Sequence, residues 1–199
     1  PETAFFRDRL VFAALANEIL PALARAPGGE PVRVWSAACG AGQEVYSLAM
    51  LLADAPALSA RVELFASDLS ERALEKAQAG IYSQFEVQHG LPARLLVRHF
   101  EKAGEAFVLS PHIRRMARWR RANLMDDISP LGRFDVVMCR CLLGQMEPEA
   151  RAQVLRRLHA VLKPGGRIVL GLKDDPGPDL TAVGPGVYAD RRDVIRSAA

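Results

Sequence analysis

The sequence predicts an α/β fold in which a mainly parallel sheet is covered by helices on both faces. Short apolar segments alternate with amphipathic helical segments, and small-residue turns join several of them. The chain has 199 residues, half of them hydrophobic, which suits one domain with a substantial core. This composition excludes a disordered chain. Because no apolar run approaches the roughly 20 residues that cross a bilayer, we expect no insertion into a membrane.

The expected elements follow one another as a doubly wound sheet requires. In the first half we expect a helix over 5–24, a strand over 32–35, a helix from Gln43 and a strand over 62–66. A further helix is expected through Ala79, with Ser70 as its N-cap and Gly80 ending it. In the second half we expect a strand over 134–139, a helix from Pro148, a turn at 163–166 and a strand over 167–172. Pro21 is expected to end or kink the first helix.

One segment, about residues 81–117, breaks this alternation and is predicted to form a small inserted β-subdomain. Residues 1–30 are interpreted as a helical lead-in, the remnant of or a linker from another domain, and residues 31–199 as the main domain. The chain begins with Pro1 rather than methionine, so we expect a trimmed or processed chain.

A turn of small residues follows the first predicted strand and precedes a helix. It contains Ala38, Gly40 and Gly42, so a ligand could approach the backbone closely, and the helix would direct its free N–H groups at that ligand. The alternative is that the small residues only permit tight packing.

Asp68 lies at the end of the second predicted strand, 26 residues beyond Gly42. In a doubly wound sheet this position places a carboxylate beside the ribose of a nucleoside bound over the first turn. The alternative is that Asp68, just before Ser70, only caps the N-terminus of the helix that follows.

Glu44 lies in the first turn of the helix that follows the glycines. It could simply favour the helix dipole. A carboxylate here would repel the pyrophosphate of a dinucleotide but would attract an ammonium or sulfonium group. The turn also lacks the full G-x-G-x-x-G spacing, so the sequence favours S-adenosylmethionine over NAD.

Asn123 and Leu124 follow a predicted strand and could meet an adenine with backbone groups and an apolar side chain, although a turn asparagine is an equal alternative. The three cysteines form neither a disulfide framework nor a zinc-site spacing. We therefore expect free thiols, no metal and a reducing, cytoplasmic setting.

Several of these residues lie in motifs that together resemble a known family. The segments are TAFFR at 3–7, WSAACGAGQEVYS at 35–47, ASD at 66–68, AGIY at 79–82, NL at 123–124, FDVVMCR at 134–140 and LKPGG at 162–166. In this order they resemble the CheR family of chemotaxis-receptor methyltransferases over almost the whole chain. The resemblance implies a Rossmann-like class I methyltransferase fold that binds S-adenosylmethionine and releases S-adenosylhomocysteine.

The resemblance also implies a reaction, a partner and site residues. The reaction would be methylation of glutamate carboxylates on the cytoplasmic helical domain of a methyl-accepting chemotaxis receptor. By position, the cofactor contacts would come from Thr3, Arg7, Ala38, Gly40, Gly42, Glu44, Asp68, Asn123, Leu124, Cys141 and Leu142. Arg7 would be the catalytic residue, because a guanidinium can hold one carboxylate oxygen while the other oxygen attacks.

The chain departs from the family pattern after Arg140. The family has Asn-Val and then Ile-Tyr-Phe, whereas this chain has Cys141-Leu142 and, further on, Gln145-Met146. A thiol cannot replace the paired donor and acceptor of an amide, and one lost buried hydrogen bond costs about 1–3 kcal/mol. A catalytically weak S-adenosylmethionine-binding module that signals by protein contact is therefore the alternative function.

The segment HIRRMARWRR at 112–121 is strongly basic. It could be a nucleic-acid patch and so indicate a nucleic-acid or small-molecule methyltransferase. It has one tryptophan and too few aromatic residues for a stacking platform. We expect a solvated hairpin edge and no nucleic-acid partner.

Overall fold

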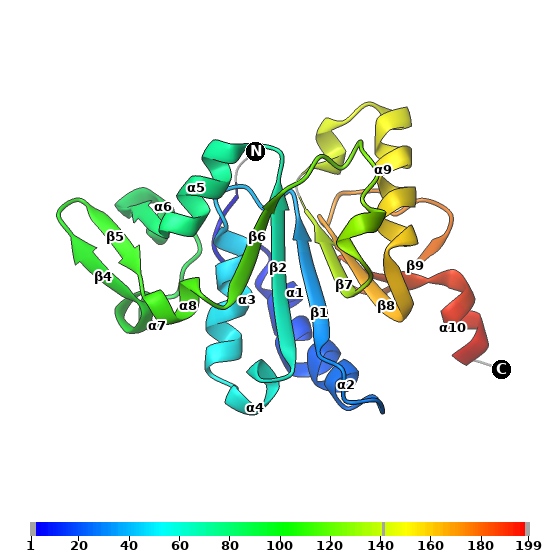
Figure 1. The fold of residues 1–199 in the computed structure, drawn as a ribbon, viewed down its shortest axis with the longest axis horizontal. Coiled ribbons are helices and arrows are strands. Elements are labelled where there is room, and N and C mark those ends of the chain that lie inside the picture. Colours follow the sequence, from blue (N-terminus) through cyan, green and yellow to red (C-terminus); the bar gives the residue numbers. More distant parts are fainter. Residues whose placement is uncertain (1–2, 141, 198–199) are drawn as a thin grey trace.

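The computed structural model describes residues 3–140 and 142–197 and contains a seven-stranded sheet in the order β6-β2-β1-β7-β8-β10-β9. Strands β6, β2, β1, β7 and β8 are parallel, and their order is the 3-2-1-4-5 order of doubly wound folds. Strand β10 pairs antiparallel with both β8 and β9. The predicted α/β fold with a mainly parallel sheet is confirmed (Figure 1).

The elements have the following bounds. The strands are β1 (Val32–Ala37), β2 (Val62–Asp68), β3 (Ile81–Ser83), β4 (Phe100–Ala103), β5 (Ala106–Leu109), β6 (Ala117–Arg121), β7 (Phe134–Cys139), β8 (Leu162–Leu170), β9 (Leu180–Gly184) and β10 (Val187–Asp190). The α-helices are α1 (Arg9–Ala14), α2 (Leu20–Ala24), α3 (Gln43–Ala53), α4 (Pro56–Ser59), α5 (Glu71–Ala79), α6 (Gln84–Gln88), α7 (Ala93–His99), α8 (Pro111–Arg114), α9 (Pro148–Ala160) and α10 (Arg191–Ser197). A π-helical turn, η1 (Leu15–Ile19), joins α1 to α2, and two 3₁₀ turns are η2 (Ser129–Leu131) and η3 (Leu143–Gln145).

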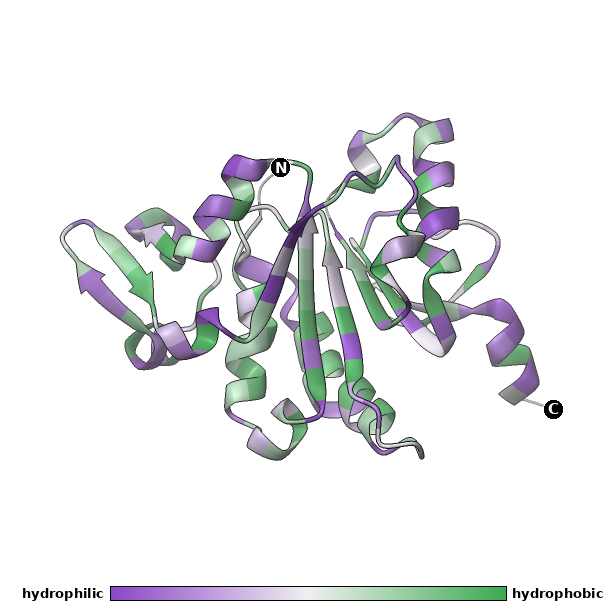
Figure 2. Ribbon diagram, viewed as in Figure 1, coloured by the Kyte–Doolittle hydropathy of each residue, from purple (hydrophilic) through white to green (hydrophobic). Residues whose placement is uncertain are grey.

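The sheet has a hydrophobic core on each face because successive side chains of a strand point to opposite sides. In β1, Val32 and Val34 pack with α1, α2 and α3, whereas Trp35 and Ala37 pack with α9. The central strands are largely apolar and the edge strand β6 is largely hydrophilic (Figure 2). Within the described residues, no helix is both long enough and apolar enough to span a membrane.

The N-terminal helix runs without a break from Arg9 to Ala24, but its hydrogen-bonding pattern changes from α to π and back to α. Pro21 lies in the first turn of α2, and the chain stays helical to Ala24. Proline has no N–H to donate, and the wider π turn directly before it accommodates this missing bond. Pro21 therefore does not end the helix at that point.

A second, three-stranded antiparallel sheet, in the order β3-β5-β4, projects from one side of the main sheet (Figure 1). It lies within the segment where the sequence predicts an insertion. The Tyr82 hydroxyl of β3 donates to the carbonyl of Ala41 at 2.7 Å, which ties this sheet to the turn after β1. The boundaries of 1–30 and 31–199 as domains, and of the insertion, stay predictions.

Two expectations for the secondary structure are wrong. Lys163–Gly166 is not a turn before the strand, because β8 already begins at Leu162. A shift in register between Phe134 and Val136 lets β8 pair through this segment, and a side chain on Gly166 would lie 2.8 Å from the Asp135 carbonyl. The basic segment is also no hairpin, since β6 is a parallel edge strand of the main sheet.

Gly42 gives a test of the packing around the turn. It has φ +84°, and an added Cβ would lie 3.0 Å from both Ala77 and Trp119. We expect Gly42→Ala to lower the free energy of unfolding by about 2–4 kcal/mol, because left-handed backbone and overpacking both cost energy. The measurement is urea unfolding. Gly104→Ala is the matched control, since Gly104 has φ +60° with nothing within 4 Å. Equal losses for both variants would contradict the packing argument.

Candidate functional site

The candidate site lies where the strand order reverses, between β1 and β7. In open α/β sheets, ligands bind outside the carboxyl ends of the strands at such a point. The ends of β1, β2, β6 and β7 carry Ala37, Asp68, Arg121 and Cys139, and the predicted residues Ala38, Asn123 and Leu142 follow just after three of these strands. The topology therefore brings the predicted residues to one edge of the sheet.

Asp68 is held by backbone N–H groups from two sides. Its Oδ2 accepts from the Gly40 N–H at 2.8 Å, and its Oδ1 accepts from the Ser70 N–H at 2.9 Å. Ser70, not Asp68, is the side-chain cap of α5, since its hydroxyl accepts from the Ala73 N–H. A carboxylate offers about four lone-pair positions, so two remain for the hydroxyls of a ribose.

The glycine turn is packed more tightly against protein than the sequence suggests. An added Cβ on Gly40 would lie 2.6 Å from the methyl group of Thr3, whose hydroxyl is hydrogen-bonded to Gln43. Ala38 and Gly40 both have left-handed backbone, with φ 56° and 55°. At positions 40 and 42, neighbouring protein side chains already leave no room for a Cβ. The glycines there are therefore explained by protein packing and do not by themselves indicate a ligand.

Glu44 lies at the start of α3 and is 6% exposed. Its carboxylate accepts a hydrogen bond from Arg140 at 2.5 Å. Burial raises the pKa of Glu44 above its ordinary value, while the positive charges of Arg140 and Arg7 oppose this effect. A bound ammonium group would favour the ionised carboxylate in the same way.

The raised pKa of Glu44 predicts a pH dependence of cofactor affinity. Protonation neutralises the carboxylate, so the affinity for S-adenosylhomocysteine should fall as the pH decreases through this raised pKa. Calorimetry at a series of pH values from about 8 to 5 measures the effect. The Glu44→Gln variant should bind more weakly at high pH and show a flatter dependence. An equally steep dependence in that variant would assign the titration to another group.

Arg7 is exposed, but the residues on both sides of it are held in place. The Phe6 N–H donates to the Ser47 hydroxyl at 2.9 Å, and Arg140 donates to the Arg7 carbonyl at 3.0 Å and to the Asp8 carboxylate. Phe6 and Asp8 both have left-handed backbone, with φ 49° and 57°. The chain thus presents the Arg7 side chain from a segment anchored to α3 and to the end of β7.

The remaining predicted residues lie beyond β6 and β7. The Asn123 side-chain oxygen accepts from the Met125 N–H at 3.0 Å, which is the turn geometry of the alternative interpretation. Its amide nitrogen donates to no residue within 3–140 or 142–197, and so could bind a ligand. Leu124 is buried in the core, which leaves mainly its backbone for a ligand. Leu142 is half-buried against the same core, and Cys141 lies outside the described residues.

Two cavities lie on either side of the end of β2. One, of about 430 Å³, is lined by residues that include Thr3, Gly40 and Asp68. The other, of about 520 Å³, is lined by residues that include Leu69 and Asn123. Asp68 lines the first cavity, and Asn123 lines the second. The first cavity leaves space beside the Asp68 carboxylate, and the positions of the ribose and adenine stay predictions.

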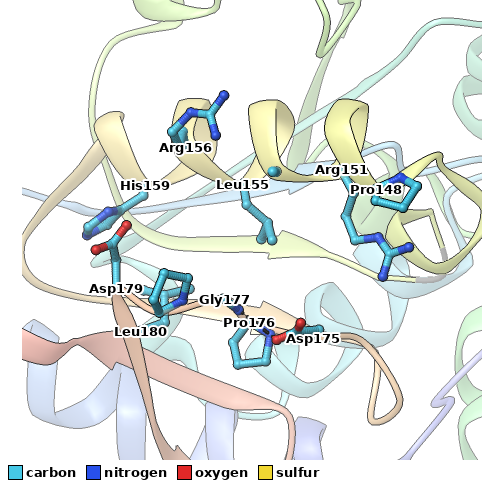
Figure 3. Close-up of a pocket in the computed structure, with 12 residues that line it drawn as sticks. Pro148, Arg151, Leu155, Arg156, His159, Asp175, Pro176, Gly177, Asp179 and Leu180 are labelled. Atoms are coloured by element: carbon cyan, nitrogen blue, oxygen red, sulfur yellow. Dashed lines mark hydrogen bonds between the residues drawn. The ribbon is translucent and has the colours of Figure 1, made fainter.

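A third cavity, of about 300 Å³, lies between α9 and the loop before β9 (Figure 3). Side chains of Arg151, Leu155 and His159 form the helix wall, and Asp175 to Leu180 form the other wall. It contains none of the predicted site residues, so the sequence argument does not connect it with the cofactor.

The basic residues of β6 are partly neutralised by neighbouring acids. Arg118 lies 3.9 Å from Glu63, and Arg121 lies 3.5 Å from Glu71. Charged side chains on an edge strand also discourage pairing with another sheet. Arg118 and Arg121 thus have acidic partners within the chain.

Two residues near the site were not identified from the sequence. Arg140 is a charged residue directly after the apolar strand β7, and this unusual position could have indicated it. Asp8 gave no such signal, since an acidic residue next to an arginine is common in sequences.

Cys39, at the turn, is 1% exposed, and burial raises the pKa of its thiol well above its ordinary value, so it is no thiolate nucleophile.

The residues present fit S-adenosylmethionine. Asp68 retains acceptor positions for ribose hydroxyls, and the buried carboxylate of Glu44 suits an ammonium group. Arg7 lies near enough to Glu44 to affect its pKa, which places a second cation, besides Arg140, beside the site. No group of three or more candidate metal ligands exists among the described residues.

Comparison with known proteins agrees with this geometry. The family model described as the CheR methyltransferase, SAM-binding domain, matches residues 1–176. Chemotaxis protein methyltransferase 1 of Pseudomonas aeruginosa is 39% identical over 179 residues, and chemotaxis protein methyltransferase Cher2 of Pseudomonas putida is 35% identical over 179 residues. In each case the match covers 87% of this chain and 65% of the relative, so the chain spans just under two thirds of their length.

Solved structures give the same fold. The crystal structure of the DszA carbon methyltransferase has a TM-score of 0.52 at 17% identity, covering 82% of this chain and 34% of that one. At this identity the likeness concerns the fold alone. Together with the match over residues 1–176, the site geometry leads to one conclusion: the chain belongs to the CheR methyltransferase family, as its SAM-binding domain, and its cofactor is S-adenosylmethionine.

Proposed function

We propose that this chain transfers the methyl group of S-adenosylmethionine to glutamate side chains on the cytoplasmic helical domain of a chemoreceptor-like protein. The observation that carries the proposal is the meeting of Asp68, Glu44 and the Arg7 segment at one edge of the sheet. The two Pseudomonas relatives, both named chemotaxis protein methyltransferases, support the chemotaxis setting.

S-adenosylmethionine would supply an electrophilic methyl group on a sulfonium: the O–CH3 bond of the ester forms as the S–CH3 bond breaks, and the sulfur leaves as the neutral thioether of S-adenosylhomocysteine. Asp68 would hold the ribose and Glu44 would hold the ammonium group, which would fix the position of the donor. The acceptor is already a carboxylate, so the chain needs no strong general base. Arg7 binds one acceptor oxygen and leaves the other aligned for attack.

Radiolabelled methyl transfer to purified receptor cytoplasmic domains tests the proposal. The expected product is a methyl ester, which releases volatile methanol in mild base, and acceptors with glutamine or alanine at the methylated positions should stay unlabelled. Base-stable label would indicate a different acceptor atom. Labelling of nucleic acid instead of protein would overturn the choice of substrate class.

The second candidate is a cofactor-binding module with little catalysis. The departures at Cys141, Gln145 and Met146 favour it, because the family has an amide at the first position and aromatic residues further on. Tight binding of S-adenosylhomocysteine without transfer to any receptor domain would support this candidate over the first.

A further inference from the structure

Arg140 connects the two halves of the site. Its side chain is fully buried at the end of β7. One terminal nitrogen donates to the Glu44 carboxylate at 2.5 Å and to the Arg7 carbonyl at 3.0 Å, and the other donates to the Asp8 carboxylate. These partners lie 96 to 133 residues away in the sequence. One guanidinium therefore joins the end of β7 to α3 and to the N-terminal segment.

The charges explain why this residue is an arginine. A buried cation is costly without ionic partners, and Arg140 has two carboxylates. With both carboxylates ionised, these three groups carry one net negative charge, and Arg7 is a further cation that acts on Glu44. The planar fork of arginine reaches three acceptors at fixed angles, and a lysine ammonium cannot reproduce this geometry.

The contact with Arg7 and Asp8 has a separate consequence. Left-handed backbone at Phe6 and Asp8 is sparsely populated for residues other than glycine, and it persists only where the surroundings hold it. On one side, the hydrogen bond from the Phe6 N–H to the Ser47 hydroxyl fixes this backbone. On the other side, the hydrogen bonds from Arg140 to the Arg7 carbonyl and the Asp8 carboxylate fix it. Without Arg140, the backbone that carries Arg7 loses its anchor on the β7 side.

We propose that Arg140 is a positioning residue for methyl transfer, which orients Glu44 toward the cofactor and fixes the backbone of Arg7 toward the acceptor. The inference rests on the proposed function for its catalytic half. The cofactor-binding half is independent of the acceptor. Donor binding and acceptor alignment thus depend on the same side chain.

The test uses Arg140→Lys, Arg140→Gln and Asp8→Asn in the full chain. Calorimetry with S-adenosylhomocysteine should show at least about a tenfold loss of affinity (~1.4 kcal/mol) for both Arg140 variants and less than a twofold change for Asp8→Asn. Amide hydrogen exchange of the peptide covering residues 3–12 should increase in all three variants, while β1 stays protected. The rate of methyl transfer at saturating cofactor should fall about tenfold in Asp8→Asn.

Lys163→Gln is the matched control. Lys163 lies 3.0 Å from Asp135 in a partly buried ion pair at the opposite end of β7, so its loss should affect stability but neither affinity nor exchange over 3–12. A folded Arg140→Lys variant with wild-type affinity and exchange would overturn the inference. Wild-type exchange and rate in Asp8→Asn would overturn its catalytic half. If Arg140→Gln does not fold, the other two variants decide. Failure of receptor methylation in the wild type refutes the proposed function but leaves the affinity and exchange results intact.

Discussion

Replacing Asp68 by alanine is expected to weaken binding of S-adenosylhomocysteine by about 100-fold or more. Two hydrogen bonds between a carboxylate and ribose hydroxyls would be lost, and bonds to charged groups contribute about 1.5–3 kcal/mol each. The variant also leaves the Gly40 and Ser70 N–H groups without their acceptor. Calorimetry measures the loss of affinity. The affinity of Asp68→Asn should lie between those of the wild type and Asp68→Ala, because an amide keeps one acceptor oxygen.

Asp175→Ala is the matched control for this substitution. The Asp175 carboxylate accepts from the Gly177 N–H at 2.9 Å, two residues on, as Asp68 accepts from Ser70. It lines the cavity beside α9 instead of the sheet edge. Its removal should leave the affinity unchanged. An Asp68→Ala variant that is folded and binds within threefold of the wild type would refute ribose binding at this site.

The position of Asp68 could be predicted because it depends on local pattern. An apolar strand, a small-residue turn and an amphipathic helix specify a βα unit, and the carboxyl ends of parallel strands lie at one edge of the sheet. Ser70 and Gly80, the caps of α5, were predicted for the same reason, since capping is a property of a few neighbouring residues. The fold class follows from such patterns repeated along the chain.

The ion pair between Arg140 and Asp8 could not be predicted in this way. The two residues are 132 positions apart, and neither has a neighbour in the sequence that indicates the pairing. Gly165 and Gly166 misled the prediction of β8 for a related reason. Glycines usually break a strand, but here the close approach of the Asp135 backbone requires a residue without a side chain at Gly166, and Gly165 has a left-handed backbone with φ +75°. Tertiary contacts decided both cases.

The edge strands show a third limit. Strands β9 and β10 are antiparallel additions to the parallel sheet. Both strands are short, and the loops on either side of β9 are rich in glycine and proline. Their apolar alternation covers only four or five residues, which is too little to separate a strand from a loop. Pairing of β10 with β8, and of β9 with β10, stabilises them as strands.

Replacing Arg7 by alanine is expected to lower kcat for methyl transfer by a factor of about 100 to 1,000, the usual effect of removing one preorganised electrostatic group. The affinity for S-adenosylhomocysteine should change little at pH 8. At lower pH the affinity should fall more than in the wild type, because Arg7 opposes the rise of the Glu44 pKa and its removal lets the carboxyl protonate earlier. Single-turnover transfer at saturating cofactor separates the chemical step from binding.

Two further variants distinguish the role of Arg7 from a general effect of charge. Arg7→Lys should recover only part of the rate, since an ammonium group offers no bidentate contact to a carboxylate. Arg9→Ala removes an exposed arginine from the first position of α1, two residues away, and should leave the rate unchanged. If Arg7→Ala and Arg9→Ala lower the rate equally, the effect is long-range attraction of an acidic acceptor. If only Arg7→Ala lowers it, and high salt does not erase the difference, Arg7 acts at the reacting carboxylate itself.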